Sequence, residues 1–272
     1  MRKPVFVTLI FLVSAISFAQ DSRASEPGAV AVQADEHQPP TPPKYCNPCV
    51  FYSGDFNPKA NPNGLLNGLF PNNVDGEVWV PFSVTNKIVV TGLFVNELFA
   101  TPPPAKASAT WGIRDGVSSG NGGQVQCQGT GTAHAAATGR RFSFNSKVYV
   151  EYTLLVKLPQ SQYCQLTNPA PDPLQRNLPP PTKGQCPPDC SMNVTVNVAP
   201  TGNPGGFASD VPSTNPAHHF GNKNLNNNSF FTSTSFGFNF VPAVQACAEG
   251  PPIAISKVGC HMFSAGLLGT GR

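Results

Sequence analysis

Residues 147–158 read KVYVEYTLLVKL, and this stretch shows the clearest structural pattern in the chain. Apolar side chains occupy every second position from Val148 to Val156, and Glu151 lies between two of them. Successive side chains of a strand point to opposite faces, so this alternation predicts a β-strand with one buried face. We expect Glu151, on the other face, to be solvated, and the same for Glu97, which lies near the end of another apolar run.

The same period of two recurs in short segments on both sides of this strand. Turn residues such as Gly, Asn and Asp separate the segments, and no long stretch has helical spacing. The expected strands lie within residues 78–84, 87–99, 107–114, 124–129, 141–145, 147–158, 192–198 and 230–241. This pattern predicts an all-β fold, built as an antiparallel two-sheet sandwich with a jelly-roll-like order and long disulfide-pinned loops.

Residues 1–19 have the build of a secretory signal peptide. The segment opens with two basic residues, residues 5–16 are apolar, and Ser17 and Ala19 are the small residues of a cleavage site. The apolar run is shorter than the roughly 20 residues that a membrane-spanning helix needs. We therefore expect a secreted protein, extracellular or periplasmic, with no membrane span in the mature chain.

Composition divides the rest of the chain. Residues 20–44 are rich in proline and nearly lack bulky apolar side chains, which predicts a disordered linker. Residues 45–245 form the expected sandwich domain, and residues 246–272 form a C-terminal tail that a disulfide loop could close. The 17 basic and 14 acidic residues are scattered, which argues against a nucleic-acid partner.

The eight cysteines predict disulfides, because an exported protein folds in an oxidising compartment. Spacing alone leaves the connectivity open. We expect Cys164 to pair with Cys186 or Cys190, closing a proline-rich loop, and Cys247 to pair with Cys260. The full set of disulfide candidates is Cys46, Cys49, Cys127, Cys164, Cys186, Cys190, Cys247 and Cys260.

A structural zinc site is the alternative for four of these cysteines. Cys46 with Cys49, and Cys186 with Cys190, have spacings that permit four thiolates to meet around one metal ion. Zinc requires thiolates, and the expected compartment favours oxidised sulfur. We therefore prefer disulfides and predict no metal ion and no cofactor.

Several strand and turn segments resemble a protein family. They are residues 79–84 (WVPFSV), 90–96 (VTGLFVN), 111–118 (WGIRDGVS), 137–140 (ATGR) and 228–237 (NSFFTSTSFG). Together they resemble a group of uncharacterised exported bacterial β-sandwich proteins of the acidobacterial type, which is similar to the exported domains of PEP-CTERM-type proteins. The resemblance implies secretion and an all-β fold, and it carries no catalytic residues to transfer.

Reactive side chains are few and dispersed along the chain. The acids of the strand region are Asp75, Glu77, Glu97, Asp115 and Glu151, and no spacing pairs two of them as glycoside hydrolysis requires. No Gly-x-Ser-x-Gly segment supplies a serine nucleophile. We therefore predict no catalytic residues and a protein that is not an enzyme.

The leading hypothesis for function is a non-catalytic secreted protein with a structural, surface-binding or matrix-binding role. A carbohydrate-binding module is the first alternative, and a hydrolase of glycans or peptides is the second. Trp79, His218 and His219 are the candidate ligand contacts. An indole can stack on a sugar ring, although burial in the core is the commoner place for tryptophan. The expected partner is a carbohydrate or another component of a cell surface or matrix.

Overall fold

The computed structural model describes the chain from residue 44 to residue 271 with several gaps. The described residues are 44–56, 58, 63–69, 74–84, 87–168, 183–186, 189–197, 206–211, 229–257, 260 and 262–271. The predicted signal peptide, nearly all of the predicted linker, and His218 and His219 lie outside them.

The described chain is built almost entirely of β-strands, which confirms the all-β prediction. The elements are β1 (Cys49–Tyr52), β2 (Gly64–Leu69), β3 (Asp75–Ser83), β4 (Ile88–Phe99), β5 (Lys106–Asp115), β6 (Gln124–Phe144), β7 (Lys147–Lys157), the 3₁₀ turn η2 (Gln160–Gln162), β8 (Cys164–Leu166), β9 (Asp189–Asn197), β10 (Gly206–Val211), β11 (Phe230–Ser233), β12 (Phe238–Pro242), α1 (Ala243–Glu249), β13 (Met262–Phe263) and β14 (Ala265–Gly271). No helix in this part of the chain is long and apolar enough to span a membrane.

Eight strands form a closed ring, in the order β4–β7–β6–β5–β9–β3–β2–β10 and back to β4. Neighbours in this ring run antiparallel. The ring closes at β10, where Phe207 and Ala208 pair with β4 on one side and with β2 on the other. The fold is therefore a closed barrel with extra strands, which corrects the predicted two-sheet jelly roll. Alternation specifies the buried face of each strand and leaves open which strands are neighbours.

The barrel interior is filled by the faces that alternate as apolar in the sequence. Inward side chains on β3, β4, β5, β7 and β9 are buried, among them Val78, Val80, Leu93, Val95, Trp111, Ile113, Leu154, Val156, Met192 and Val194. Burial of such side chains contributes about 25 cal/mol per Å² of apolar surface. The predicted core faces of these five strands are thus confirmed, although Val148, near the turn that begins β7, is 51% exposed.

β6 is 21 residues long, whereas the sequence predicts two short strands in its place. Its middle is made of small side chains that show no alternation, which hides the strand. The pairing with β7 shifts register between Ala137 and Arg141, and Gly139 adopts a φ of 89° there. A glycine accepts this backbone conformation without strain, so β6 continues through a bulge instead of ending.

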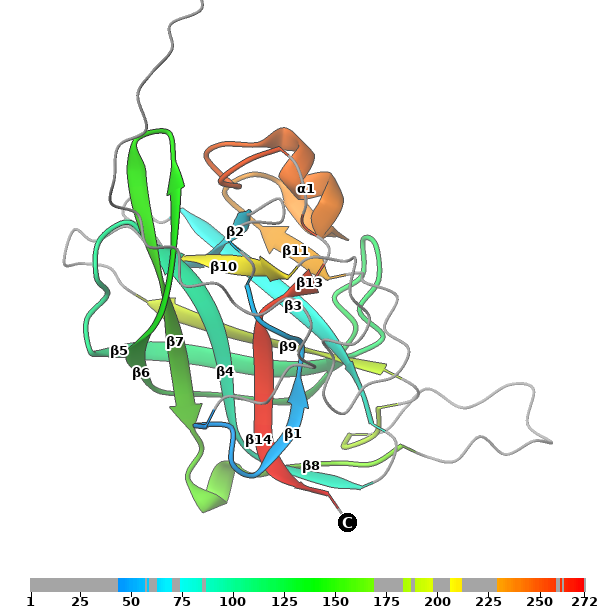
Figure 1. Cartoon of the computed structure of the whole chain (residues 1–272). Helices are drawn as coiled ribbons and strands as arrows, with labels where there is room; N and C mark the ends of the chain where they lie inside the picture. Colours follow the sequence, from blue (N-terminus) through cyan, green and yellow to red (C-terminus); the bar gives the residue numbers. More distant parts are fainter. Residues whose placement is uncertain are drawn as a thin grey trace, which may run out of the picture. The chain divides into compact units, whose positions relative to one another are not determined.

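Two strands from opposite ends of the described chain extend the sheet beside β4. β14 pairs with β4 from Ala265 to Gly271, and β1 pairs with β14, so that β7, β4, β14 and β1 lie side by side (Figure 1). Residues 262–271 are therefore part of the sheet and not a separate tail. We call residues 44–56, which include β1, the strap.

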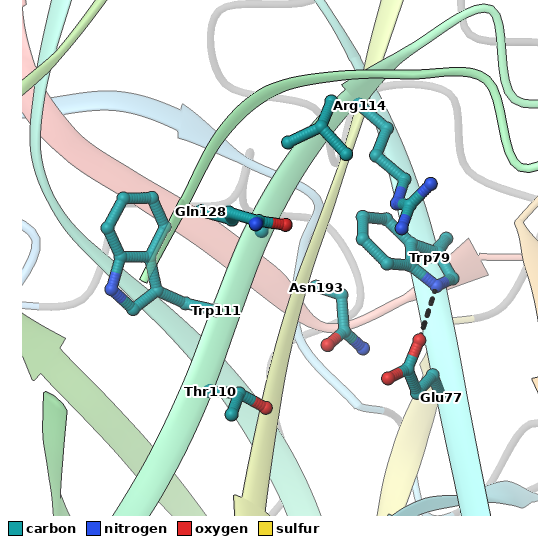
Figure 2. A pocket seen from close by; sticks show the side chains of 9 residues that line it. Glu77, Trp79, Thr110, Trp111, Arg114, Gln128 and Asn193 are labelled. Atoms are coloured by element: carbon teal, nitrogen blue, oxygen red, sulfur yellow. Dashed lines mark hydrogen bonds between the residues drawn. The ribbon is translucent and has the colours of Figure 1, made fainter. Parts of the chain in front are cut away.

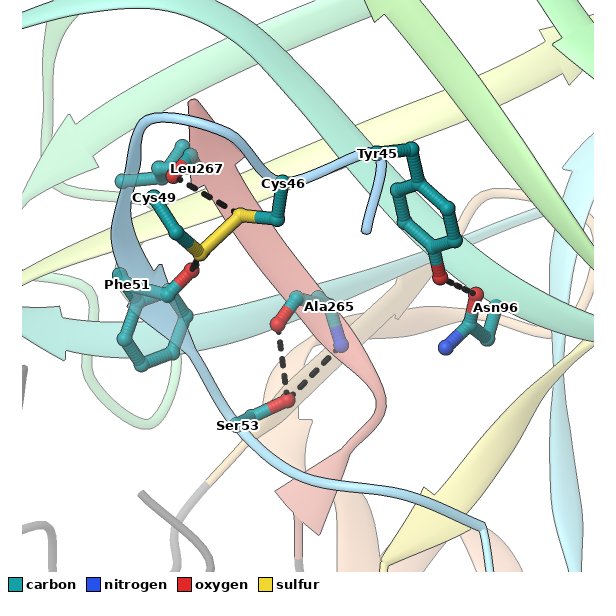
Figure 3. The surroundings of a disulfide bond; sticks show 8 residues. All are labelled: Tyr45, Cys46, Cys49, Phe51, Ser53, Asn96, Ala265 and Leu267. Atoms are coloured by element: carbon teal, nitrogen blue, oxygen red, sulfur yellow. Dashed lines mark hydrogen bonds between the residues drawn. A yellow bond between two sulfur atoms is a disulfide. The ribbon is translucent and has the colours of Figure 1, made fainter. Parts of the chain in front are cut away.

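Contacts to β14 and β4 hold the strap in place (Figure 3). The Cys46 sulfur lies 3.5 Å from the carbonyl oxygen of Leu267. The Ser53 hydroxyl accepts a hydrogen bond from the backbone N–H of Ala265 at 2.8 Å. The Tyr45 hydroxyl donates to Oδ1 of Asn96 at 3.3 Å. The strap therefore covers the outer side of β4.

The cysteines form four disulfides: Cys46–Cys49, Cys127–Cys164, Cys186–Cys190 and Cys247–Cys260. The predicted Cys247–Cys260 pair is present. The predicted partners of Cys164 are wrong, because Cys164 on β8 meets Cys127 of β6 across 37 residues instead of closing the proline-rich loop. No cysteine is left as a free thiol, so no thiolates remain for the zinc alternative. Four disulfides indicate an oxidising environment, extracellular or periplasmic.

Candidate functional site

A pocket of about 120 Å³ opens on the outer face of four consecutive strands of the barrel, β3, β9, β5 and β6 (Figure 2). Its lining residues are Glu77, Trp79, Thr110, Trp111, Gly112, Arg114, Val125, Gln128 and Asn193. We call it the Trp79 pocket. Trp79 alternates with the buried Val78 and Val80, which places its indole on the outside of the sheet.

Gly112 makes room for the Trp79 indole on this face. On β5, Gly112 pairs with Asn193 of β9 on one side and with Gln128 of β6 on the other. A Cβ atom at position 112 would lie 3.0 Å from Cη2 of Trp79. The missing side chain therefore lets the indole reach across β9 onto β5.

Arg114 covers the indole from outside. Its guanidinium carbon lies 5.0 Å from the ring centroid of Trp79 and 5.7 Å from that of Phe240. Nη1 also donates a hydrogen bond to the carbonyl oxygen of Gly122 at 3.1 Å. Cation–π contacts of this kind contribute about 0.5–2 kcal/mol and fix the guanidinium at one place.

Trp79 itself is only 4% exposed. The indole of this candidate ligand contact borders the pocket, but Arg114 and Phe240 cover it, so it offers no open platform for a sugar ring. Its Nε1 donates a hydrogen bond to Oε2 of Glu77 at 3.1 Å. Burial raises the pKa of Glu77, while this hydrogen bond and the charge of Arg114 oppose the shift. The Trp79 pocket thus holds one carboxyl group and one guanidinium group, each in contact with the indole.

Asn193 forms the buried floor of the pocket. Figure 2 shows it between Glu77, Trp79 and Arg114 on one side and Thr110 and Gln128 on the other.

Both the amide nitrogen and the amide oxygen of the Asn193 side chain form hydrogen bonds. Its Nδ2 donates to Oδ1 of Asn67 at 3.1 Å and to the carbonyl oxygen of Val78 at 2.9 Å, and its Oδ1 accepts from Thr195. Asn193 is therefore held rigidly.

Behind the floor, the hydrogen bonds continue into the barrel. Asn67 of β2 donates from Nδ2 to Oε1 of Glu97 at 2.7 Å. Glu97 is fully buried, which corrects the expectation of a solvated side chain, and burial raises its pKa to about 8. The carboxyl group is therefore protonated at neutral pH. A buried chain of polar groups, Glu97–Asn67–Asn193, connects the interior of the barrel to the pocket.

Glu151 is also fully buried, contrary to the expectation that solvent reaches it. Its face of β7 lies close to the strap, which the alternation of β7 could not reveal. Oε2 accepts from Nε of Arg140 at 2.5 Å and from the hydroxyl of Thr138 at 2.7 Å. Arg140 also contacts Asp55 of the strap at 2.9 Å. Burial raises the pKa of Glu151, while Arg140 and Thr138 lower it.

The two buried glutamates do not face each other. Glu97 pairs with Tyr152, and Leu98 pairs with Glu151, so the two acids lie on neighbouring strands one position out of register. Side chains in this relation point to opposite faces of the sheet. Glu97 consequently points into the barrel and Glu151 outward, which is not the facing arrangement of two carboxyl groups that glycoside hydrolysis uses.

Asp75 has a structural role at the first position of β3. Its carboxylate accepts from the backbone N–H groups of Thr234 and Ser235, at 3.0 and 2.8 Å, and from their hydroxyl groups. Partial burial opposes ionisation, but these hydrogen bonds hold the pKa of Asp75 well below its usual range. Asp75 thus fixes the turn between β11 and β12.

The remaining polar residues of the Trp79 pocket were missed from the sequence. Arg114 and Thr110 alternate around Gly112 on β5, and Asn193 lies opposite Gly112 on β9. Polar residues on the non-core face of neighbouring strands are the signal that could have indicated the site. That signal needs strand pairing, which the sequence leaves open. Comparisons with protein-family models, curated proteins and solved structures give no match.

Proposed function

We propose that the protein is a non-catalytic exported barrel that binds a component of a cell surface or matrix at the Trp79 pocket. The observation that carries this proposal is the convergence of Glu77, Arg114, Thr110 and Gln128 around one outward pocket. These side chains supply donors and acceptors of hydrogen bonds from three different strands. Rigid strands are suited to hold such groups in place, and few polar groups are enough to orient a ligand.

The placement of the acids supports binding over hydrolysis. Glu97 and Glu151 point to opposite faces, and Asp75 is committed to a turn. Glu77 is the acid of the pocket, and its neighbour there is Arg114, not a second carboxyl group. A binding role needs no pair of carboxyl groups, so the arrangement fits it directly.

Two matched glutamine variants test the proposal. Gln128→Ala removes an exposed side chain from the pocket, and Gln124→Ala removes the same side chain from the same strand outside it. Labelled wild-type protein and both variants are applied to a glycan array and to insoluble cellulose, chitin and peptidoglycan. The retained protein and any released sugar are measured. We expect retention of wild type and Gln124→Ala, about tenfold weaker retention of Gln128→Ala, and no released sugar.

Two results would contradict the proposal. Equal retention of both variants on every surface would place the binding site elsewhere. Release of sugar that one Asp or Glu substitution abolishes would show an enzyme.

A further inference from the structure

The size of the Trp79 pocket limits what it can hold. Its volume of about 120 Å³ is well below the roughly 300–1,000 Å³ of a typical small-molecule site. Arg114 and Trp79 are fixed by their mutual contact and by Phe240, so they do not yield space readily. The pocket therefore accommodates a unit of about one small ring. A longer chain must continue outside it.

The pocket itself contains one acidic and one basic side chain. Glu77 supplies an acid and Arg114 a cation, both line the pocket, and the charge of Arg114 acts to lower the pKa of Glu77. A second anion would meet Glu77 at short range in a partly buried place, where repulsion between like charges costs most. An uncharged hydroxyl group has no such penalty. Such a group can donate a hydrogen bond to a carboxylate such as that of Glu77 and can accept one from a guanidinium such as that of Arg114.

The rim adds groups that suit a polyhydroxylated ligand. Thr110 carries a hydroxyl group and Gln128 an amide, and both side chains are exposed beside the buried Asn193. Neutral donors and acceptors of this kind bind hydroxyl groups without requiring a charge on the ligand. The recognition would depend on hydrogen bonds, because the Trp79 ring face is covered.

From these observations we infer that the Trp79 pocket binds a single uncharged sugar unit at the end of a glycan chain. This inference rests on the proposed function. It names the class of ligand for the same site.

The test uses an array on which each glycan ending in a neutral hexose has a counterpart ending in the corresponding uronic acid. We expect the full-length protein to bind neutral ends at least about tenfold more tightly than their uronic counterparts at pH 7. Glu77→Gln keeps an oxygen for the Trp79 hydrogen bond and removes the charge, so it should narrow this preference. Gln128→Ala should weaken the binding of both neutral and uronic ends, and Gln124→Ala should leave the binding of both unchanged.

Other outcomes separate this inference from the proposed function. Tighter binding of uronic ends that still depends on Gln128 would overturn the inference and leave the binding pocket in place. Equal binding of a chain whose terminal sugar is blocked by a bulky substituent would overturn the assignment to a chain end. Absence of binding to every glycan, with retention on a surface that contains none, would overturn the inference as a whole.

Discussion

Glu97 and Glu151 occupy neighbouring strands of one sheet and are both fully buried, yet only Glu151 has a cation beside its carboxyl group. Glu97 faces the barrel interior, where its hydrogen-bond partner is Asn67 and no cation contributes to its pKa. Glu151 faces outward under the strap and meets Arg140. A buried acid without a cation remains protonated, whereas one with a cation can ionise within an ion pair. A shift of one position in register places the two acids on opposite faces of the sheet, and the face determines whether a cation lies nearby.

The largest expected effect comes from removing the cation beside Glu151. Arg140→Gln leaves a buried carboxylate with Thr138 but without its charge partner, and such a change costs about 3–5 kcal/mol. Urea denaturation at pH 7 measures the loss of unfolding free energy. Arg141→Gln is the matched control, since Arg141 is the exposed neighbour on the same strand, and it should change stability by less than about 0.5 kcal/mol. Equal effects of both variants would refute the role of the ion pair.

A smaller effect, with a distinct pH dependence, is expected for Glu97. The folded-state pKa of about 8 lies above the ordinary value of 4.5, so the folded protein binds the extra proton. The resulting stability is fully present below pH 4.5 and is lost as the pH rises through about 8.

Glu97→Gln removes this titration and keeps an oxygen acceptor for Asn67. Relative to that of wild type, the unfolding free energy of the variant should therefore rise by roughly 3–4 kcal/mol between pH 5 and pH 9. Urea denaturation at several pH values measures the difference. Parallel pH profiles for the two proteins would show that Glu97 is not protonated in the fold.

The smallest expected effect separates the hydrogen bond of Glu151 from its ion pair. Thr138→Val keeps the shape of the side chain and removes the hydroxyl group that donates to Oε2 of Glu151. We expect a loss of about 1–2 kcal/mol in urea denaturation. Thr130→Val, at an exposed position of the same strand, should have no measurable effect. A loss as large as that of Arg140→Gln would show that the hydroxyl group and the ion pair act as one unit.

The contrast between the two glutamates also shows what sequence patterns can and cannot predict. Alternation identified β3, β4, β5, β7 and β9, because each keeps one apolar face over several residues. It missed β2, β10 and β14, which are short and rich in glycine or small residues. Of these, β10 closes the barrel between β2 and β4, and β14 extends the sheet beside β4. Without them, the sequence pattern suggested two separate sheets.

The feature of the site that was hardest to predict from the sequence was the burial of its polar side chains. Glu151 stands on the polar face of an amphipathic strand, and its cover comes from other segments: Arg140 of β6 contacts it, and the strap, about a hundred residues earlier, contacts Arg140 through Asp55. Trp79 was a candidate ligand contact from the sequence and lines the pocket, whereas the placement of Arg114 and Asn193 beside it depends on the pairing of β5 with β9. Interactions that join distant segments leave no local pattern, and that is the reason they were missed.

The pairing of β1 with β14 has a consequence for the order in which the molecule assembles. Cys49 pairs with Leu268, so β1 has no partner strand until β14, more than two hundred residues later, has been synthesised. Contacts over such a separation form late and slow the folding reaction. We therefore expect Arg140 to lack its contact with Asp55 of the strap until this pairing has formed.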